Sequence, residues 1–310
     1  MIAVDEALLR TLPLPVHGDD DDKDARGKVV VGGGGREVPG AALLAAVAAL
    51  RAGAGKLQIA VPAGVAVPLA IAVPESRVIS LPETAAGEVA PTALDVLGPT
   101  LERSDAVLVG PGMLDGDAAT RLAAGLVAVP GETRFVLDAG ALVGLARGAG
   151  VVRGATGRVA LTPHAGEMAR LMECERRAVE AEPERHALAA AERYGAVVAL
   201  KGGRTVIATS DGRRWCYRDG RVGLATSGSG DTLAGVVAGL LARGCDPLRA
   251  VLWGVYLHGE AGNRLSNAHG PVGFLARELL AEIPAIMASL DAGWGGRSAA
   301  TRSPQDRPAW

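Results

Sequence analysis

The chain has 310 residues, of which 49% are hydrophobic, and its formal net charge at pH 7 is −2. This length suits one large α/β domain or two smaller ones, and the apolar content is ample for a buried core. The near-neutral charge and an aromatic content of 3% argue against a nucleic-acid partner, because the chain offers no basic stripe for phosphates and few rings on which bases could stack.

The N-terminal residues and the apolar runs predict a cytoplasmic protein without a membrane partner. The longest unbroken apolar run, residues 41–50, is too short to span a bilayer and is closed by Arg51. Asp5 and Glu6 stand where a secretory signal peptide would be basic. The three cysteines are widely spaced and form no C-x-x-C pair, which indicates neither a disulfide framework nor a zinc site.

Short β-branched runs alternate along the chain with alanine- and leucine-rich helical stretches. This βαβ alternation predicts an α/β fold with a mostly parallel central sheet and helices on both faces. No break in composition divides residues 25–290, so we expect them to form a single catalytic domain. The predicted strands span residues 28–31, 57–60, 106–109, 134–137, 159–161, 197–200 and 205–208.

The two ends of the chain differ from this pattern. Residues 17–24 read H-G-D-D-D-D-K-D, and we interpret residues 1–24 as a flexible acidic leader, although D-D-D-D-K also matches an engineered protease site. From Asp291 onward the composition turns to Gly, Arg, Ser and Pro. We therefore expect a disordered tail over residues 291–310.

A glycine-rich turn follows the first predicted strand. Residues 31–40 read V-G-G-G-G-R-E-V-P-G and contain no G-x-G-x-x-G register, so they are not a dinucleotide fingerprint. Neither Gly-Lys pair of the chain, at 27–28 and 55–56, is followed by the Ser or Thr of a Walker A loop. We predict a strand-to-helix turn whose small residues allow close approach by either a ligand or the sheet.

The strand at residues 159–161 runs into the sequence T-P-H-A-G-E, which opens a helix. Ligands favour such strand ends. His164 can bond a polar substrate there, and Glu167 in the first helical turn can hold hydrated magnesium beside phosphates. Thr162 followed by Pro163 and a later Glu also describes an ordinary helix start, so both interpretations stay open.

The next strand, residues 197–200, is followed by K-G-G-R-T at 201–205. A Gly-Gly turn that joins two strands accounts for this segment without any ligand. Lys201 and Thr205 become candidate ligand residues only if the turn faces Gly230.

Residues 226–244 hold the most informative segment, in which the turn S-G-S-G-D enters a helix. From Leu233 onward apolar residues recur on one helical face, so we predict a helix that begins near Asp231 and ends at Gly244. Its free N–H groups and the positive end of its dipole point at residues 228–230, where phosphate oxygens are the natural occupants. Asp231 is either the proton acceptor of a phosphoryl transfer or only a helix cap.

Taken in this order, these segments resemble the ADP- or ATP-dependent NAD(P)H-hydrate dehydratase family, a branch of the ribokinase-like fold. The resemblance spans about residues 25–290. Related small-molecule kinases share the G-x-G-D loop but commonly carry Asn where His164 stands, so T-P-H-x-G-E favours the dehydratase. The motifs are P-G-A-A-L-L-A-A at 39–46, A-L-R-A-G-A-G-K-L at 49–57, V-G-P-G-M at 109–113, V-L-D-A-G-A-L at 136–142, L-T-P-H-A-G-E-M-A-R-L at 161–171, L-K-G-G-R-T-V-I-A at 200–208, S-G-S-G-D at 227–231 and V-Y-L-H-G-E-A-G at 255–262.

The resemblance implies a ribokinase-like three-layer sandwich and a set of site residues. The implied nucleotide-binding residues are Lys201, Gly202, Gly203, Arg204, Thr205 and Gly230. The implied substrate-binding residues are Ala42, Gly112, His164 and Asp231. The anion hole would consist of Gly228, Ser229 and Gly230, and Glu167 would hold Mg²⁺ indirectly.

The implied reaction is the repair of hydrated NADH or NADPH, with ADP or ATP as phosphoryl donor. Asp231 accepts the proton of the ring hydroxyl, the hydroxyl becomes a phosphate ester, and the ring nitrogen expels it. We expect a homo-oligomer. We also expect it to act with a separate epimerase, because the epimerase domain of bifunctional relatives needs a further sheet domain, for which this chain lacks the length. One alternative is a kinase of the same fold for a vitamin-precursor alcohol of the hydroxymethylpyrimidine or thiazole type. A non-catalytic nucleotide-binding protein is the other alternative, and the intact Asp231, His164 and Lys201 speak against it.

Three positions depart from the family pattern. Residues 22–27 read D-K-D-A-R-G where the family often has H-K-G-x-x-G, which puts the usual contacts of that segment in doubt. Ser229 replaces the usual Thr and keeps a hydroxyl. Asn263 stands where an Asp often closes H-G-x-A-G-D, so we assign Asn263 no role.

Overall fold

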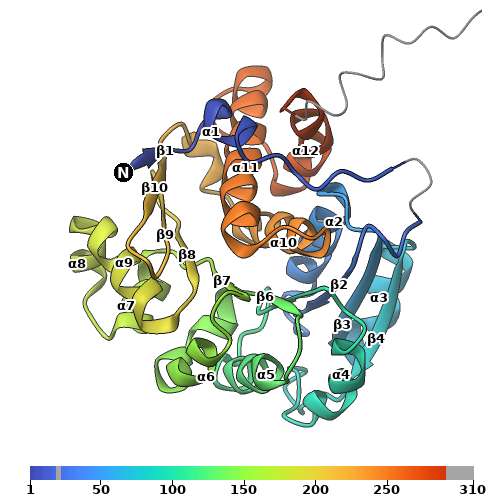
Figure 1. Cartoon of the computed structure of the whole chain (residues 1–310). Helices are drawn as coiled ribbons and strands as arrows, with labels where there is room; N and C mark the ends of the chain where they lie inside the picture. Colours follow the sequence, from blue (N-terminus) through green and yellow to red (C-terminus); the bar gives the residue numbers. More distant parts are fainter. Residues whose placement is uncertain (19–21, 291–310) are drawn as a thin grey trace, which may run out of the picture.

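The computed structural model describes residues 1–18 and 22–290. Its described part contains a ten-stranded sheet in the order β1-β10-β9-β8-β7-β6-β5-β2-β3-β4 (Figure 1). Neighbouring strands are parallel except at β9, which is antiparallel to both β8 and β10. The strands are β1 (Ile2–Ala3), β2 (Lys28–Gly32), β3 (Lys56–Pro62), β4 (Ser76–Leu81), β5 (Ala106–Val109), β6 (Arg134–Leu137), β7 (Val159–Leu161), β8 (Val197–Leu200), β9 (Thr205–Ala208) and β10 (Arg214–Tyr217).

The sheet is buried on both faces, which accounts for its almost continuous apolar strands. In β2, Val29 and Val31 pack into one core cluster while Val30 packs into the other, because successive side chains of a strand point to opposite faces. All four residues of β5 are buried for the same reason. The expected α/β three-layer arrangement is therefore confirmed.

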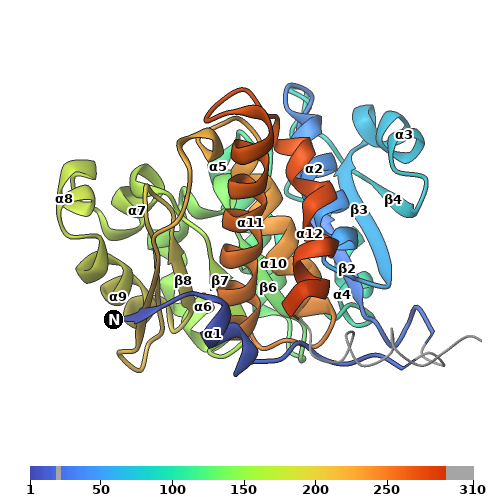
Figure 2. The ribbon, with the colours of Figure 1, turned by 90° about the horizontal axis from the view of Figure 1, so that it is seen from above.

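Two sets of helices form the outer layers, one above and one below the sheet in Figure 1, and Figure 2 looks onto the upper set. The helices over one face are α1 (Glu6–Arg10), α2 (Pro39–Arg51), α3 (Ala63–Ala72), α10 (Ser229–Ala242), α11 (Pro247–His269) and α12 (Ala276–Leu290). The helices over the other face are α4 (Ala93–Leu101), α5 (Gly116–Ala128), α6 (Ala149–Gly154), α7 (Ala165–Met172), α8 (Arg176–Ala181) and α9 (Pro183–Tyr194). No helix within residues 1–18 and 22–290 is long and apolar enough to cross a membrane.

Helices α2 and α10 pack with their backbones close together, and this contact fixes the position of the α10 N-terminus. A Cβ atom on Gly235 would lie 2.2 Å from the carbonyl oxygen of Ala45, and one on Gly239 would lie 2.3 Å from that of Ala49. Helix α10 begins at Ser229, two residues before the predicted start, because the turn ends at Gly228 in the left-handed conformation (φ 85°).

Five of the predicted strands have the observed bounds, and β2 and β3 extend beyond the predicted ranges. Three strands were missed. Strand β1 has only two residues, and its partner Trp215 lies more than 200 residues away. Strand β10 is a short run between arginines, and β4 is a half-exposed edge strand. None of the three has the buried β-branched pattern that identified the others.

The N-terminal residues expected to be a flexible leader contribute to the fold. Strand β1 pairs with β10, and the residues after it bury Leu9 and Leu14 against the core. The indole Nε1 of Trp253 donates to the carbonyl oxygen of Leu12 at 2.7 Å. Residues 2–14 thus belong to the domain, whereas the expected tail, residues 291–310, lies outside the described residues.

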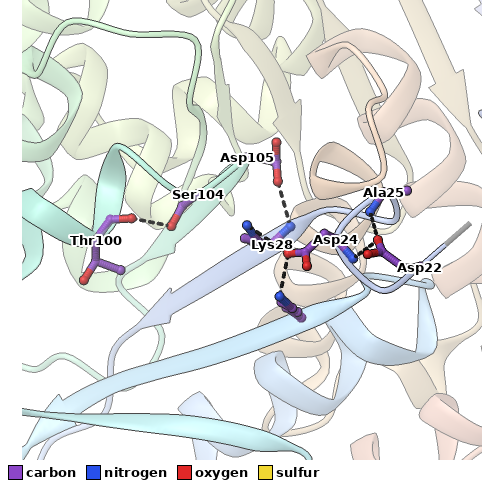
Figure 3. Close-up of polar contacts among 8 residues, drawn as sticks. Asp22, Asp24, Ala25, Lys28, Thr100, Ser104 and Asp105 are labelled. Carbon is purple, nitrogen blue, oxygen red and sulfur yellow. Dashed lines mark hydrogen bonds and ion pairs between the residues drawn. The ribbon is translucent and has the colours of Figure 1, made fainter.

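Part of the acidic run is also built into the structure, at the amino ends of β2, β3 and β5 (Figure 3). The carboxylate of Asp24 contacts the ammonium groups of Lys28 and Lys56, and these bonds lower the pKa of Asp24 to about 2. The carboxylate of Asp22 accepts the backbone N–H groups of Asp24 and Ala25. This cluster anchors the segment at the edge of the sheet opposite the candidate site, while residues 19–21 of the run lie outside the described residues.

Candidate active site

Three neighbouring parallel strands, β6, β7 and β8, deliver the central residues of the site from their carboxyl ends. Asp138 follows β6, His164 follows β7 and Lys201 follows β8. The backbone N–H of Lys201 donates to the carbonyl oxygen of Pro163 at 2.8 Å, which holds the last two segments side by side. The Nζ atom of Lys201 lies 3.3 Å from the point that a Cβ atom on Gly230 would occupy. The K-G-G-R-T turn therefore faces the N-terminus of α10.

A cleft of about 680 Å³ opens at this junction. The residues of the predicted set that line it are His164, Lys201, Gly202, Gly203, Thr205, Ser229 and Gly230. The remaining lining residues come from β10, the segment before α10, and α10 and α11, and are Tyr217, Gly220, Arg221, Val222, Leu224, Ala225, Thr226, Leu233, Val255, His258 and Gly259. One end of the cleft is therefore charged and polar, and the other is mainly apolar.

Lys201 and Asp138 form a buried ion pair at the charged end. The Lys201 Nζ atom lies 2.8 Å from Asp138 Oδ1, and Asp138 is 2% exposed. The hydroxyl of Thr162 donates to the same oxygen at 2.8 Å. Burial lowers the pKa of Lys201, but the carboxylates of Asp138, Glu167 and Asp231 outweigh it and raise the net value above the ordinary one. Lys201 is thus a protonated, positively charged ammonium group at neutral pH.

Asp231 lies beside this pair, in the first turn of α10. Burial raises the pKa of Asp231 to about 6, and the charges of Asp138 and Glu167 add to the increase while Lys201 opposes it. A carboxyl group that titrates near neutral pH can take up a proton during turnover and release it afterwards. The position of Asp231 therefore suits a general base.

His164 and Glu167 form a capping box at the start of α7. The Nδ1 atom of His164 accepts the backbone N–H of Gly166 at 3.0 Å and that of Glu167 at 3.3 Å, so its ring proton resides on Nε2. In return, Glu167 Oε2 accepts the backbone N–H of His164 at 2.8 Å. Burial raises the pKa of Glu167. His164 is therefore both a helix cap and a residue of the cleft wall.

The N-terminus of α10 differs in one respect from the expected anion hole. The backbone N–H of Ser229 donates to the carbonyl oxygen of Thr226 at 3.2 Å, so it is engaged within the turn. The hydroxyl of Ser229 instead forms a 2.9 Å hydrogen bond with Nε2 of His258. The N–H groups of Gly230 and Asp231 lie in the first helical turn, where no intrahelical acceptor precedes them. These two groups are therefore the candidate anion-binding donors of the loop.

The family model described as NAD(P)H-hydrate dehydratase matches residues 29–285. The chain belongs to this family. A relative from Xanthomonas campestris, an ADP-dependent (S)-NAD(P)H-hydrate dehydratase, is 47% identical over 296 residues, which are 94% of this chain and 97% of the relative. A Bacillus subtilis protein of the same name is 32% identical and covers 88% of this chain and 93% of its own length.

Solved structures agree with the expected fold. The ADP/ATP-dependent NAD(P)H-hydrate dehydratase from Bacillus subtilis, co-crystallised with ATP and Mg²⁺, has a TM-score of 0.77 and 28% identity, and the match covers 93% of this chain and 98% of that one. A ribokinase-like superfamily protein from Enterococcus faecalis has a TM-score of 0.79 at 24% identity, covering 94% and 96%. The expected ribokinase-like fold is confirmed.

Six residues implied by the family resemblance are absent from the lining of the cleft, namely Ala42, Gly112, Glu167, Arg204, Gly228 and Asp231. Glu167 and Asp231 nevertheless lie close enough to Lys201, which does line it, to raise the pKa of that ammonium group. Gly112 follows β5 at the same sheet edge, where a Cβ atom would lie 2.4 Å from the carbonyl oxygen of Val38. Ala42 is fully buried in this structure, and its expected substrate contact stays a prediction. Arg204 contacts Glu184 at 3.6 Å and does not line the cleft. The roles implied for Gly112 and Arg204 stay predictions.

Two residues of the site, Asp138 and His258, were not identified from the sequence. Asp138 directly follows a predicted parallel strand, so the preference of ligands for strand ends could have identified it. The next residue, Ala139, has a positive φ of 46°, a strained conformation that is common near functional sites. His258 lies inside a long helix, 29 residues from Ser229. It belongs to the family motif at 255–262, but nothing in that motif indicates a contact with Ser229.

Proposed function

We propose that this protein uses ADP or ATP to dehydrate hydrated NADH and NADPH, which regenerates the reduced cofactor. The observation that carries the proposal is the position of Asp231, a carboxylate with a raised pKa at the N-terminus of α10 beside the Lys201 ammonium. The Xanthomonas campestris dehydratase, which matches over nearly its whole length, supports the substrate assignment.

The two ends of the cleft suit the two parts of a nucleotide. Val222, Leu224 and Val255 give an apolar wall for a base, and Tyr217 adds an aromatic ring. At the opposite end, Lys201 and the N–H groups of the first turn of α10 are donors that bind phosphate oxygens well. The terminal phosphate would then lie next to Asp231.

Asp231 begins the reaction by accepting the proton of the substrate's ring hydroxyl. The hydroxyl oxygen attacks the terminal phosphorus of the nucleotide, whose bond to the leaving phosphate oxygen breaks, so that ADP yields AMP and ATP yields ADP. Lys201 and the α10 N–H groups stabilise the charge on the transferring group. The lone pair of the ring nitrogen then expels inorganic phosphate, and loss of a ring proton restores the double bond.

The charged cluster fits a magnesium ion held through water. Three carboxylates, those of Asp138, Glu167 and Asp231, surround one ammonium group. Burial is the main cause of the raised pKa values of Glu167 and Asp231, and the neighbouring carboxylates add to it. The oxygens of Glu167 are already engaged by His164, and the described residues contain no group of three or more potential ligands arranged to hold a metal directly. Glu167 would therefore hold hydrated Mg²⁺, which when bound neutralises phosphate charge.

We further propose that a separate epimerase acts with this protein. A bifunctional NAD(P)H-hydrate repair enzyme from Moorella thermoacetica is 40% identical over 281 residues, which are 90% of this chain and 52% of that enzyme. This chain thus corresponds to about half of the bifunctional relative.

The decisive test is incubation of the protein with hydrated NADH, Mg²⁺ and either ADP or ATP. We expect recovery of the reduced-nicotinamide absorbance together with stoichiometric inorganic phosphate. The Asp231→Asn variant is the negative control, and an exposed aspartate of α4 provides the matched control Asp95→Asn. Consumption of nucleotide with accumulation of a stable phosphate ester of a vitamin-precursor alcohol, and none with the hydrate, would identify a kinase instead.

A further inference from the structure

One pair of polar residues in the cleft wall, Ser229 and His258, has no role in the proposed mechanism. Ser229, the first residue of α10, is 5% exposed, and His258 lies in the middle of α11. The Ser229 Oγ and His258 Nε2 atoms are 2.9 Å apart, and both residues line the cleft. Because the backbone N–H of Ser229 is bonded to Thr226, the hydroxyl is the group through which Ser229 can act on a ligand.

His258 is uncharged at neutral pH. Burial lowers its pKa to about 4, and the nearby Lys201 ammonium adds to this effect while a hydrogen bond with the Ser229 backbone opposes it. A neutral imidazole carries its proton on one ring nitrogen only, so Nε2 either accepts from the Ser229 hydroxyl or donates to it.

The two tautomers leave the Ser229 hydroxyl with opposite properties. If Nε2 of His258 accepts, the hydroxyl proton points at the imidazole and the free lone pairs of Oγ repel a phosphate oxygen. If Nε2 donates, the hydroxyl proton is free to point into the cleft. Phosphate oxygens near pH 7 are mainly acceptors, so only the second arrangement binds them favourably.

We propose that, when phosphate occupies the N-terminus of α10, His258 is held as the Nε2–H tautomer and thereby makes the Ser229 hydroxyl a phosphate donor. This inference rests on the proposed function, because it requires a nucleotide phosphate beside Gly230. His258 is a positioning residue, since it acts on the ligand through Ser229. The hydroxyl then binds phosphate in place of the Ser229 backbone N–H, which donates to the carbonyl oxygen of Thr226.

Substitutions at the two positions give a first test, with the KM for ADP or ATP as the readout. His258→Leu removes the donor, and Ser229→Ala removes the hydroxyl, so each should raise this KM about 10-fold, the usual effect of losing a hydrogen bond to a charged group. The double variant should be no worse than either single one. His258→Gln, whose amide NH₂ can donate to Ser229, and Ser229→Thr should stay within about threefold of the wild type.

The matched control is His186→Gln, because His186 lies on α9 against Cys174 and outside the cleft. It should leave both kcat and KM unchanged. Equal nucleotide KM values for the wild type and the His258→Leu variant would overturn the inference.

The tautomer itself can be observed by NMR. The chain contains five histidines, so ¹⁵N-histidine labelling gives few signals, and the His258→Gln variant assigns the one that disappears. With saturating ADP or with inorganic phosphate, we expect the His258 signals of a neutral ring protonated at Nε2. A ring protonated at Nδ1 in the complex overturns the inference. Failure of the wild type to bind ADP by calorimetry refutes the proposed function instead, so the two failures are distinguishable.

Discussion

Replacement of Asp231 by asparagine should make the protein both inactive and more stable at neutral pH. The amide has nearly the same shape as the carboxylate but cannot accept the substrate proton, and loss of a general base typically costs about 10²–10⁴-fold in rate. The stability gain arises because the folded protein holds the Asp231 carboxylate in a buried, negatively charged environment. The neutral amide avoids both the cost of burying a charge and the repulsion from the carboxylates of Asp138 and Glu167.

The size of the gain follows from the pKa of Asp231. Folding raises this pKa from its ordinary value of 3.8 to about 6, a shift of about 2 units, and each unit corresponds to about 1.4 kcal/mol. Above pH 6 the ionised carboxylate therefore destabilises the native state by at most about 3 kcal/mol. Between pH 6 and 4 the native protein binds more protons than the unfolded chain, so the penalty disappears as the pH falls.

Urea denaturation of the wild type and of the Asp231→Asn variant at several pH values measures this effect. We expect the variant to be more stable by about 2–3 kcal/mol near pH 8 and the difference to close as the pH approaches 4. The exposed Asp95→Asn control should show no such pH-dependent gain. A variant that is equally stable or less stable at pH 8, or a difference that does not change with pH, would refute the electrostatic reasoning.

The pH dependence of catalysis, the buried ion pair and the helix cap each give a further test. A pH–rate profile should show kcat/KM falling about tenfold per pH unit below about pH 6, because protonated Asp231 cannot act as base, and a flat profile would remove it from that role. Lys201→Ala leaves the buried Asp138 carboxylate unpaired and should lower the free energy of unfolding by about 3–5 kcal/mol. Adding Asp138→Asn should restore part of this loss. An unchanged denaturation midpoint of Lys201→Ala would contradict a stabilising ion pair. His164→Ala should cost about 1 kcal/mol by loss of the cap and raise the KM for the hydrated dinucleotide more than that for the nucleotide. His164→Asn keeps a capping side chain, so a rise in the substrate KM without the stability loss would separate the two roles.

The sequence predicted most of the layered fold because the signals involved are local. A buried parallel strand such as Ala106–Val109 is apolar at every position, and its bounds could be read directly. The missed strand Ile2–Ala3 pairs with Trp215 and Cys216, and no local pattern reports a partner so far along the chain. The acidic residues before Lys28 show the same limit, since their ion pairs form only once β2 and β3 lie side by side.

The same division holds for the site. The family motifs, the carboxylate of Asp231 at a loop-to-helix junction and the candidate positions His164 and Lys201 could all be recognised from the order of residues. Only the tertiary structure placed Asp138 against Lys201, 63 residues away, and Ser229 against His258. The physical reason is that parallel strands gather their carboxyl ends at one sheet edge whatever their separation in the chain, and that burial among these neighbours, rather than residue type, sets the pKa of Asp231.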